Sequence, residues 1–431
     1  MKRGIPVFLM LMQISGAACA DDASVQLMQQ ELAELRKGMV DLRGLVQSQG
    51  QLIQEQGATI SALQAELKRQ VELPAPSQPA DRQPAASPRA LTGKWNPDIG
   101  VIADVVARLD SPKSDEEGAD RISARAVELS VGSAVDPYSR LDATFSFSDF
   151  EEAAVEEAYY THFNLPLGMT GRVGRFKPGV GKAIPVHRDT LDTVDEPLVI
   201  QRYFGVEGLN KSGADLKLPL DLPTPWTHEF MAGVLEGGNG EGGTAFGAVR
   251  RHPTVYAHLK NYFDITDASG LELGGSFMIG SKDEDSSSEV QIFGVDGTWI
   301  HRIDENRRLK LQAEAFLMDR GETVIYVENE DLGALVPQTF DFTPWGTYAL
   351  ADLRFAPQWS TGFRYDFVEL VDTAGPQPED ESYSVYLTFY QSEYARWRAQ
   401  FSHAELSTGE DDNQVLLQGT FAIGEHKHKI Q

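Results

Sequence analysis

Ionisable side chains gather in the stretch 178–204, where apolar residues separate them. A histidine beside carboxylates is able to coordinate a metal ion, and fixed charges in water act on passing ions. The apolar residues, among them Val186, Leu191 and Val194, indicate a loop that packs against another part of the protein. The stretch is also too long for a simple surface turn. Its ionisable residues are His187, Arg188, Asp189, Asp192, Asp195, Glu196 and Arg202.

A second set of candidate residues lies on the polar faces of predicted strands, with carboxylates in the early strands and arginines in the late ones. Opposite charges across a narrow aqueous pore create a transverse field, which orders dipolar solutes and biases the passage of ions. In an alternative interpretation the arginines pair with Asp352 and Asp366 on their own strands and stiffen the wall. The predicted pore-lining residues are Asp104, Glu128, Asp142, His258, Lys260, Arg354, Arg364, Arg396 and Arg398.

The sequence contains no evident nucleophile–base pair, phosphate-binding loop or pair of catalytic carboxylates, so we expect neither an enzyme nor a cofactor. Zinc is the sharper alternative, held by His187 with Asp189 and Asp192, or by the terminal Glu425-His426-Lys427-His428. Lysines alternate with the terminal histidines and the chain ends there, which disfavours that second site. We therefore predict no resident metal.

Strands position these residues, and alternation of apolar and polar side chains predicts the strands. The alternation repeats five times between residues 345 and 423. In one of these segments Val385 and Leu387 alternate with Ser384 and Tyr386. Because successive side chains of a strand point to opposite faces, each predicted strand has one apolar face and one polar face.

A soluble sandwich also alternates, with its polar face in bulk water. Aromatic residues near strand ends, strands of about 9–11 residues, and alternating short and long connections favour an outer-membrane barrel instead. We therefore predict an all-β transmembrane antiparallel barrel of about sixteen strands, in residues 93–431. The strands are expected to start near Ile99, Arg121, Arg140, Ala153, Thr170, Val206, His228, Val255, Leu271, Glu289, Lys310, Thr347, Trp359, Ser382, Ala395 and Gln414.

The connections support this order, because every second one is a short, turn-forming segment. These segments are residues 135–138, 165–168, 267–270, 304–306 and 357–358. If the first strand leaves the periplasm, the short turns and both termini lie in the periplasm.

The N-terminus resembles a secretory signal peptide over residues 1–20. Lys2 and Arg3 precede an apolar run that is too short to span a membrane, and Ala18-Cys19-Ala20 forms the cleavage site. Lipidation of Cys19 is the alternative, although Gly16 stands where a lipoprotein signal normally has leucine. Cleavage after Ala20 leaves a mature chain without cysteine, which excludes disulfides and cysteine-based zinc sites.

Residues 21–73 carry a seven-residue apolar repeat typical of a periplasmic coiled coil. A single amphipathic helix is the alternative, but a seam two positions wide favours self-association. Dimer and trimer both remain open. Prolines then mark a semi-rigid linker over residues 74–92. The expected core of the coiled coil includes Leu32, Leu35, Met39, Leu42, Val46, Ile53, Ile60 and Leu63.

The chain has a formal net charge of −26. Much of it comes from acidic runs in the predicted long loops, such as residues 115–117, 283–285 and 410–412. These runs are typical of a solvated surface, with cation bridges to lipid head groups as a secondary use. Nucleic acid is excluded as a partner because clustered basic charge is missing.

A run of residues between Asn96 and Pro223 resembles a known family. It comprises Gly174-Arg175-Phe176, His187, Val194-Asp195, Pro197-Leu198-Val199, Gly205, Glu207-Gly208-Leu209-Asn210 and Gly213, with Asp136-Pro137-Tyr138 and Glu156-Glu157-Ala158-Tyr159 upstream. The chain is similar here to outer-membrane β-barrels often called zinc-regulated TonB-dependent receptors, and to the phosphate-selective porins. This resemblance implies an outer-membrane barrel. By analogy with general porins, a long loop after the fifth strand constricts the pore, and we expect His187, Arg188, Asp192, Asp195 and Arg202 there.

We therefore predict an outer-membrane porin of a Gram-negative bacterium that lets small hydrophilic solutes or ions diffuse passively. Its partners are expected to be outer-membrane lipid, two further copies in a homotrimer, and peptidoglycan through the coiled coil. A structural tether between outer membrane and peptidoglycan is one alternative. A metal-linked outer-membrane receptor is the other.

Overall fold

The computed structural model describes residues 97–111, 121–149, 153–247, 252–282, 289–320, 322–329, 333–371, 378–409 and 411–424. The predicted signal peptide, coiled coil, linker and terminal histidines lie outside these residues. Among the described residues, no helix is long and apolar enough to cross a membrane.

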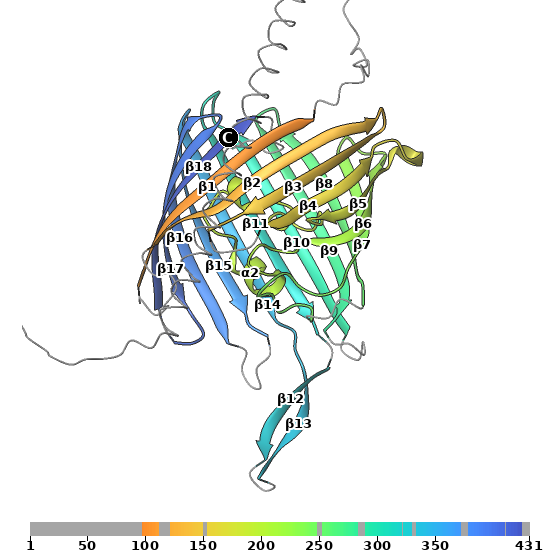
Figure 1. The fold of residues 1–431 in the computed structure, drawn as a ribbon, viewed down its shortest axis with the longest axis vertical. Helices are drawn as coiled ribbons and strands as arrows, with labels where there is room; N and C mark the ends of the chain where they lie inside the picture. The colour runs from red at the N-terminus through yellow and green to blue at the C-terminus, as the bar shows by residue number, and fades with distance from the viewer. Residues whose placement is uncertain are drawn as a thin grey trace, which may run out of the picture. The chain divides into compact units, whose positions relative to one another are not determined.

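Sixteen antiparallel strands of the described chain close into a barrel, which confirms the predicted antiparallel barrel of about sixteen strands (Figure 1). In chain order they are β1 (Asp98–Ser111), β2 (Arg121–Asp136), β3 (Ser139–Phe147), β4 (Ala154–His162), β5 (Thr170–Phe176), β6 (Lys211–Leu220), β7 (Thr227–Leu235), β8 (Thr254–Thr266), β9 (Ser269–Ser281), β10 (Glu289–Arg302), β11 (Arg308–Asp319), β14 (Trp345–Ala356), β15 (Trp359–Glu369), β16 (Glu379–Ser392), β17 (Ala395–Glu405) and β18 (Asp411–Gly424).

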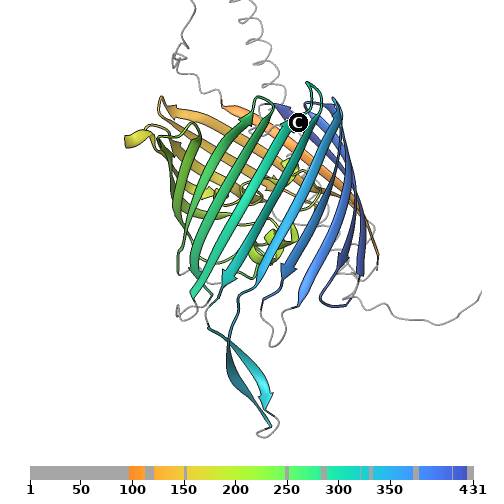
Figure 2. The same ribbon diagram turned by 180° about the vertical axis from the view of Figure 1, so that it is seen from behind.

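Each barrel strand pairs with its neighbours in sequence, and β18 closes the circle against β1 (Figure 2). Closure satisfies the backbone N–H and C=O groups that an open sheet edge would expose to lipid. The connections alternate as predicted, short at one end of the barrel and long at the other. We call these the turn end, with connections such as 137–138, 267–268 and 357–358, and the loop end.

Two segments differ from the prediction. The sixth strand begins at Lys211 and not near Val206, because Gly205 and Gly208 adopt φ angles of 118° and 71° and still belong to the preceding loop. A two-stranded hairpin of β12 (Glu322–Asn329) and β13 (Ala334–Asp341) occupies the long connection between β11 and β14. No strand is predicted between those that start near Lys310 and Thr347, so this hairpin is an addition to the prediction.

Apolar side chains cover the outer surface of the barrel and polar ones face its interior. On β16, Val385 is 49% exposed whereas its neighbour Ser384 is fully buried. Leu387 of the same strand, Phe401 of β17 and Leu417 of β18 are likewise exposed. A water-soluble protein rarely exposes apolar patches of more than a few hundred Å², so this surface suits hydrocarbon and not water.

Aromatic pairs mark both ends of this apolar surface. Trp359 and Phe389 lie 4.7 Å apart at the turn end, measured between ring centroids. Trp345 and Phe367 lie 4.7 Å apart at the loop end. Rings at these two levels are typical of the aromatic girdles that mark the membrane–water interfaces of outer-membrane barrels.

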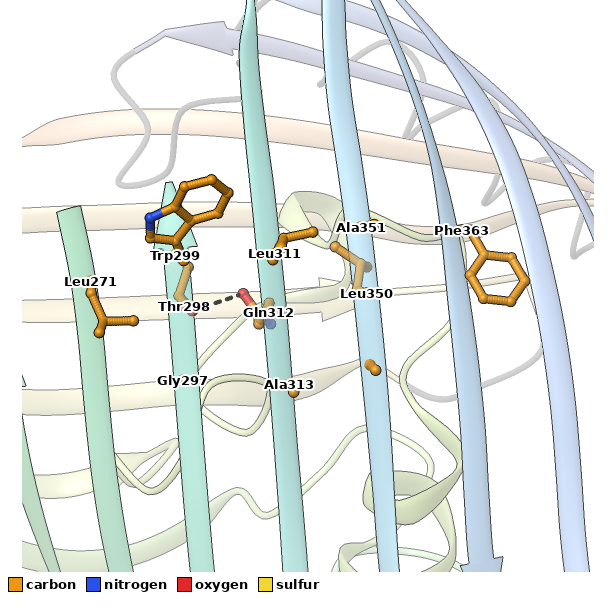
Figure 3. Close-up of a pocket in the computed structure, with 11 residues that line it drawn as sticks. Leu271, Gly297, Thr298, Trp299, Leu311, Gln312, Ala313, Leu350, Ala351 and Phe363 are labelled. Carbon is orange, nitrogen blue, oxygen red and sulfur yellow. Dashed lines mark hydrogen bonds between the residues drawn. The ribbon is translucent and has the colours of Figure 1, made fainter. Parts of the chain in front are cut away.

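A shallow apolar groove of about 420 Å³ interrupts the outer surface across β9 to β15 (Figure 3). Its floor is low because Gly297, Ala313 and Ala351 are small, and Trp299 and Phe363 flank it. Gly297, Ala313 and Ala351 belong to the outward set of their strands, whereas Asp296, Glu314 and Asp352 belong to the inward set. The groove is therefore part of the lipid-facing surface and does not open into the lumen.

A charge placed on the outer face tests its contact with lipid. Replacing Val385 with arginine near the middle of β16 is expected to destabilise the barrel by about 2–4 kcal/mol, the cost of a cation at the bilayer midplane. The same change at Glu393, exposed in the turn between β16 and β17, should cost about 0–1 kcal/mol. Urea titration in phosphocholine vesicles measures both values. Equal midpoints for the two variants would contradict a lipid-facing β16.

Candidate functional site

The segment between β5 and β6, residues 177–210, folds into the barrel and is called the inner loop below. It contains a short 3-10 helix, η2 (Arg188–Thr190), and one α-helix, α2 (Leu198–Phe204). Figure 1 shows α2 inside the ring of strands. The inner loop contacts inward-facing side chains of β2, β4, β10, β11, β15 and β17, so it reaches both walls.

An apolar cluster holds α2 against the wall formed by β14, β15 and β16, with β11 beside it. Val199, Ile200, Tyr203 and Phe204 are fully buried, and the Phe204 ring packs edge-on against Phe316 with centroids 5.1 Å apart. The hydroxyl of Tyr203 also donates to the carbonyl of Glu369, at 2.9 Å. Aromatic residues supply much of this cluster, and buried aromatic side chains contribute large areas to packing.

A second loop, residues 236–247, locks the end of α2 through its backbone. The N–H of Gly240 donates to the carbonyl of Phe204 at 2.9 Å, and that of Val206 donates to Glu241 at 2.9 Å. A Cβ added at Gly240 would lie 2.4 Å from the carbonyl oxygen of Gly208. Only glycine permits so close an approach of two backbones. Packed protein therefore fills part of the lumen.

Arg364 of β15 fixes the middle of the inner loop. Its guanidinium lies 2.7 Å from the Asp366 carboxylate on its own strand and 3.1 Å from the Asp195 carboxylate on the loop. It also donates to the Thr193 hydroxyl and to the backbone carbonyls of Asp195 and Glu196. Planar guanidinium groups present five donors, which explains how one side chain holds both strand and loop.

Three inward-facing residues of β17 also bind this part of the inner loop. Arg396 donates to the carbonyl of Asp189, and Arg398 donates to those of Leu191 and Thr193, the latter two at 2.8 and 2.7 Å. The side-chain oxygen of Gln400 accepts from the N–H of Val194 at 2.7 Å. These strand residues therefore satisfy loop backbone groups that would otherwise be buried without partners.

Carboxylates and lysines also attach the loop to β11, two strands from β15. Glu314 of β11 accepts from the N–H groups of Lys182 and Ala183, at 3.1 and 3.2 Å. Lys310 donates to Asp192 at 2.7 Å. Burial alone would raise the pKa of the Asp192 carboxyl, but the nearby Lys310 ammonium outweighs it and keeps that pKa below its ordinary value.

His187 lies among carboxylates of β2 and β4. Its Nδ1 is 3.0 Å from Glu156 Oε1 and 3.7 Å from Glu128 Oε2, and its Nε2 is 3.3 Å from Glu157 Oε2. Burial would lower the pKa of the His187 imidazole, but hydrogen bonds to Glu156 and Glu157 raise it to about 10. Burial raises the pKa of the neighbouring Asp189 carboxyl above its ordinary value.

Two bulges turn charged residues into the interior against the strict alternation. Glu156 is the extra residue where Glu157 pairs with Thr144 and Val155 pairs with Phe145, so two consecutive glutamates of β4 reach His187. Arg125 is the extra residue of β2 opposite Asp104 and Val105. It donates to the Asp104 carboxylate at 2.8 Å. Bulges are known to redirect side chains in this way.

Two cavities remain beside the inner loop. One of about 480 Å³ lies near the loop ends of β1, β2 and β16 to β18, lined by Arg121, Asp195 and Gln414 among others. Another of about 350 Å³ lies near the turn ends of β5 and β6, lined by Arg172, His187 and Lys217 among others. The inner loop contributes to the walls of both, and most of the residues that line them are polar or charged.

The structure places the nine predicted pore-lining residues on inward faces. Arg364, Arg396 and Arg398 lie beneath the inner loop and are at most 4% exposed. Arg364 also pairs with Asp366, the arrangement of the alternative interpretation. The other contacts are those of Asp104 with Arg125, Asp142 with Arg140, His258 with Ser276, Lys260 with Glu272, Glu128 with His187, and Arg354 with the carbonyl of Pro357. Their part in ion passage stays a prediction.

The five predicted constriction residues all belong to the inner loop, and their contacts differ. Arg188 binds Glu196 and Glu207 within the loop itself, both pairs within 3.3 Å. Arg202 binds Asp380 of β16 at 2.7 Å. Four residues that contact or belong to the inner loop are not among the predicted site residues: Lys177, Lys182, Glu156 and Gln400. Two adjacent glutamates in a predicted strand were the one available signal, because strict alternation would have directed one of them into lipid.

No protein-family model matches the chain. An uncharacterized protein of Aquifex aeolicus (strain VF5) is 29% identical over 329 residues, which cover 69% of this chain and 68% of that protein. Among solved structures, Pseudomonas putida OprB in a high-pH structure aligns with a TM-score of 0.53 at 10% identity, covering 76% of this chain and 94% of that chain.

Two further structures give the same result. A loop-deletion mutant of OmpT, an outer membrane protein of Vibrio cholerae, has a TM-score of 0.51 at 10% identity, with 76% of this chain and 99% of that chain covered. An anion-selective porin from Comamonas acidovorans has a TM-score of 0.50 at 9% identity, with the same coverage. The chain therefore shares the fold of porin-type outer-membrane barrels.

Proposed function

We propose that this protein is an outer-membrane porin through which small hydrophilic solutes or ions diffuse passively. One observation carries the proposal: a closed barrel is apolar outside and charged inside, with polar cavities on both sides of the inner loop. Charged inner walls are useful to a protein that conducts water-soluble solutes, and they disfavour a barrel that serves only as an anchor. Transport without catalysis agrees with the porin-type fold.

The inner loop is the proposed constriction. It lies beside wall residues of both signs, carboxylates on β1 and β2 and arginines on β15 and β17. Thr420 and Gln418 of β18 donate to Asp104 of β1 and also contact Arg396 and Arg398 of β17. Loop and wall charges neutralise one another over most of this region, which supports weak selectivity for ions. We also propose, from the sequence resemblance alone, that the protein is related to the zinc-regulated TonB-dependent receptors and the phosphate-selective porins.

Self-association, expected as a homotrimer, is supported by the short strands β4, β5 and β7 of 9, 7 and 9 residues. Seven residues rise about 23 Å along the strand and, at a tilt of 45°, about 16 Å across the membrane. That is less than the apolar band of about 25 Å typical of such barrels. A second copy of the protein, packed against β4, β5 and β7, would cover this low part of the barrel wall. The native mass of the detergent-solubilised protein tests this, and a single-copy mass would contradict it.

We also propose that the N-terminal region consists of a signal peptide, a periplasmic coiled coil and a linker. A coiled coil over residues 21–73 would join the copies and reach towards peptidoglycan. Deleting residues 25–70 is expected to weaken self-association and leave the barrel folded. Detachment of the outer membrane in such a strain would support the tether function as well.

Conductance in planar lipid bilayers tests the porin proposal. The purified protein is expected to insert in steps and conduct ions with a linear current–voltage relation. The reversal potential under a salt gradient then gives its ion preference, which we expect to be weak. A barrel that inserts but conducts no ions would overturn the proposal, and insertion can be checked independently by its resistance to protease.

A further inference from the structure

The cluster around His187 has the donor set of a metal site. Nδ1 of His187 and the carboxylate oxygens of Glu128 and Glu156 lie within 4.8 Å of one another. Nδ1 is 3.0 Å from Glu156 and 3.7 Å from Glu128. Ligands about 2.1 Å from a tetrahedral zinc ion are about 3.4 Å apart, so these distances bracket the expected value.

The opposite nitrogen of the same ring already has the partner that metal sites require. Nε2 of His187 lies 3.3 Å from Glu157 Oε2. Histidine ligands usually donate their second ring N–H to a carboxylate, which fixes the orientation of the ring and increases its basicity. The bulge at Glu156 produces this arrangement, because it lets consecutive glutamates approach both nitrogens of one imidazole.

A fourth carboxylate nearby indicates that the cluster needs a cation. Asp189 is 2% exposed, and among the described residues neither of its carboxylate oxygens has a hydrogen-bond partner. Its charge interacts with His187 and with Glu156. Two cations lie nearby. Lys177 donates to the carbonyls of Val186 and Glu207, at 3.3 and 3.2 Å, and its Nζ is 3.8 Å from Glu156 Oε1. Arg396 donates to the backbone carbonyl of Asp189 and makes no hydrogen bond to its carboxylate. Buried carboxylates without a partner are costly, and a bound cation removes that cost.

We propose that His187, Glu128 and Glu156 bind a divalent transition-metal cation such as Zn²⁺, with Glu157 orienting the histidine. One nitrogen and two carboxylate oxygens, with a water in the fourth position, suit Zn²⁺, whereas Ca²⁺ takes six to eight oxygen ligands. The metal would join the inner loop to β2 and β4. The inference goes beyond the porin function and does not depend on whether the barrel conducts.

The expected consequence is a metal that stabilises the loop by binding only the folded protein. Isothermal titration calorimetry of the full mature protein, stripped with EDTA in detergent and titrated with ZnCl₂, should show one ion per chain. Replacing His426 and His428 by alanine in every sample removes the terminal histidines as a competing site. Ca²⁺ and Mg²⁺ should bind far more weakly than Zn²⁺.

Three isosteric variants identify the ligands. Glu128→Gln and Glu156→Gln are each expected to weaken Zn²⁺ binding by 100-fold or more, and Glu157→Gln by about 10–100-fold, the usual effect of a group that orients a ligand. Glu207→Gln, on the exposed side of the same loop, is the matched control and should bind like the parent.

Absorption of the Co²⁺-loaded protein provides a second readout that does not require stability or transport. Intense visible bands would report a four-coordinate site, and their loss in Glu156→Gln would assign the ligand. Absence of Zn²⁺ binding, or equal affinity in Glu128→Gln, Glu156→Gln and the control, would overturn the proposal. The cluster would then be a protonated histidine held between carboxylates. The conductance experiment has a separate outcome, so failure of one proposal is distinguishable from failure of the other.

Discussion

Replacing Arg364 with alanine is expected to release the inner loop and increase the single-channel conductance. Arg364 is 1% exposed and binds Asp366 on the wall and Asp195 on the loop. Without it, two carboxylates would face each other with no cation between them. Removing one partner of a buried ion pair typically costs about 3–5 kcal/mol. The hydrogen bonds between the barrel strands are unaffected, so the lost free energy is that which holds the inner loop in place.

Planar-bilayer recordings measure this effect as higher conductance and greater open-channel noise. Arg307→Ala is the matched control, because Arg307 is exposed in the turn between β10 and β11 and pairs there with Asp304. That variant should conduct like the parent. Adding Asp366→Asn to Arg364→Ala removes one of the uncompensated charges. The double variant should therefore hold the loop better than Arg364→Ala and conduct less than it does. Unchanged conductance and noise in Arg364→Ala would refute the anchoring role.

The barrel was predictable because one signal repeats in nearly every strand. On β16 and β17, exposed apolar residues such as Val385 and Trp397 alternate with buried polar ones such as Ser384 and Arg398. Fifteen of the sixteen expected starts lie within a few residues of the observed ones. The exception is the start expected near Val206. Backbone contacts with residues 239–243 keep the chain in the loop as far as Asn210, and alternation of side chains does not reveal such contacts.

The direction of single side chains was less predictable. Arg125 and Glu156 occupy bulges, and one extra residue reverses the face to which the next side chain points. Alternation would have placed each on the lipid face. Their partners, Asp104 and His187, lie far away in the sequence and meet them only once the barrel has closed.

The position of the inner loop was only partly predictable. Its apolar residues predicted packing, but the surface that receives them includes Phe316 and Tyr348 of distant strands. The arginines of β15 and β17 were predicted to line a pore. In the structure Arg398 binds carbonyls of residues more than 200 positions earlier in the chain, a contact that the sequence did not predict. Such pairings depend on how the loop enters the barrel, which composition and periodicity do not encode.

Phe204→Ala is expected to loosen the inner loop through lost packing and not through charge. The Phe204 side chain is fully buried and its ring packs against Phe316. Truncating a buried phenylalanine typically costs about 3–5 kcal/mol, part of it for the void left behind. Its backbone carbonyl would still accept from Gly240, so the variant removes only the side chain from the contact.

Limited proteolysis of the folded protein measures this loosening, because an open loop is cut while the paired strands of the barrel resist. Val206→Ala is the control: that side chain is 47% exposed on the same loop, and its removal should change cleavage little. Equal protection of the loop in both variants would show that the apolar cluster does not hold it. If Phe204 and Arg364 anchor one cooperative unit, the double variant should lose less than the sum of the single effects, because the first release already frees the second contact.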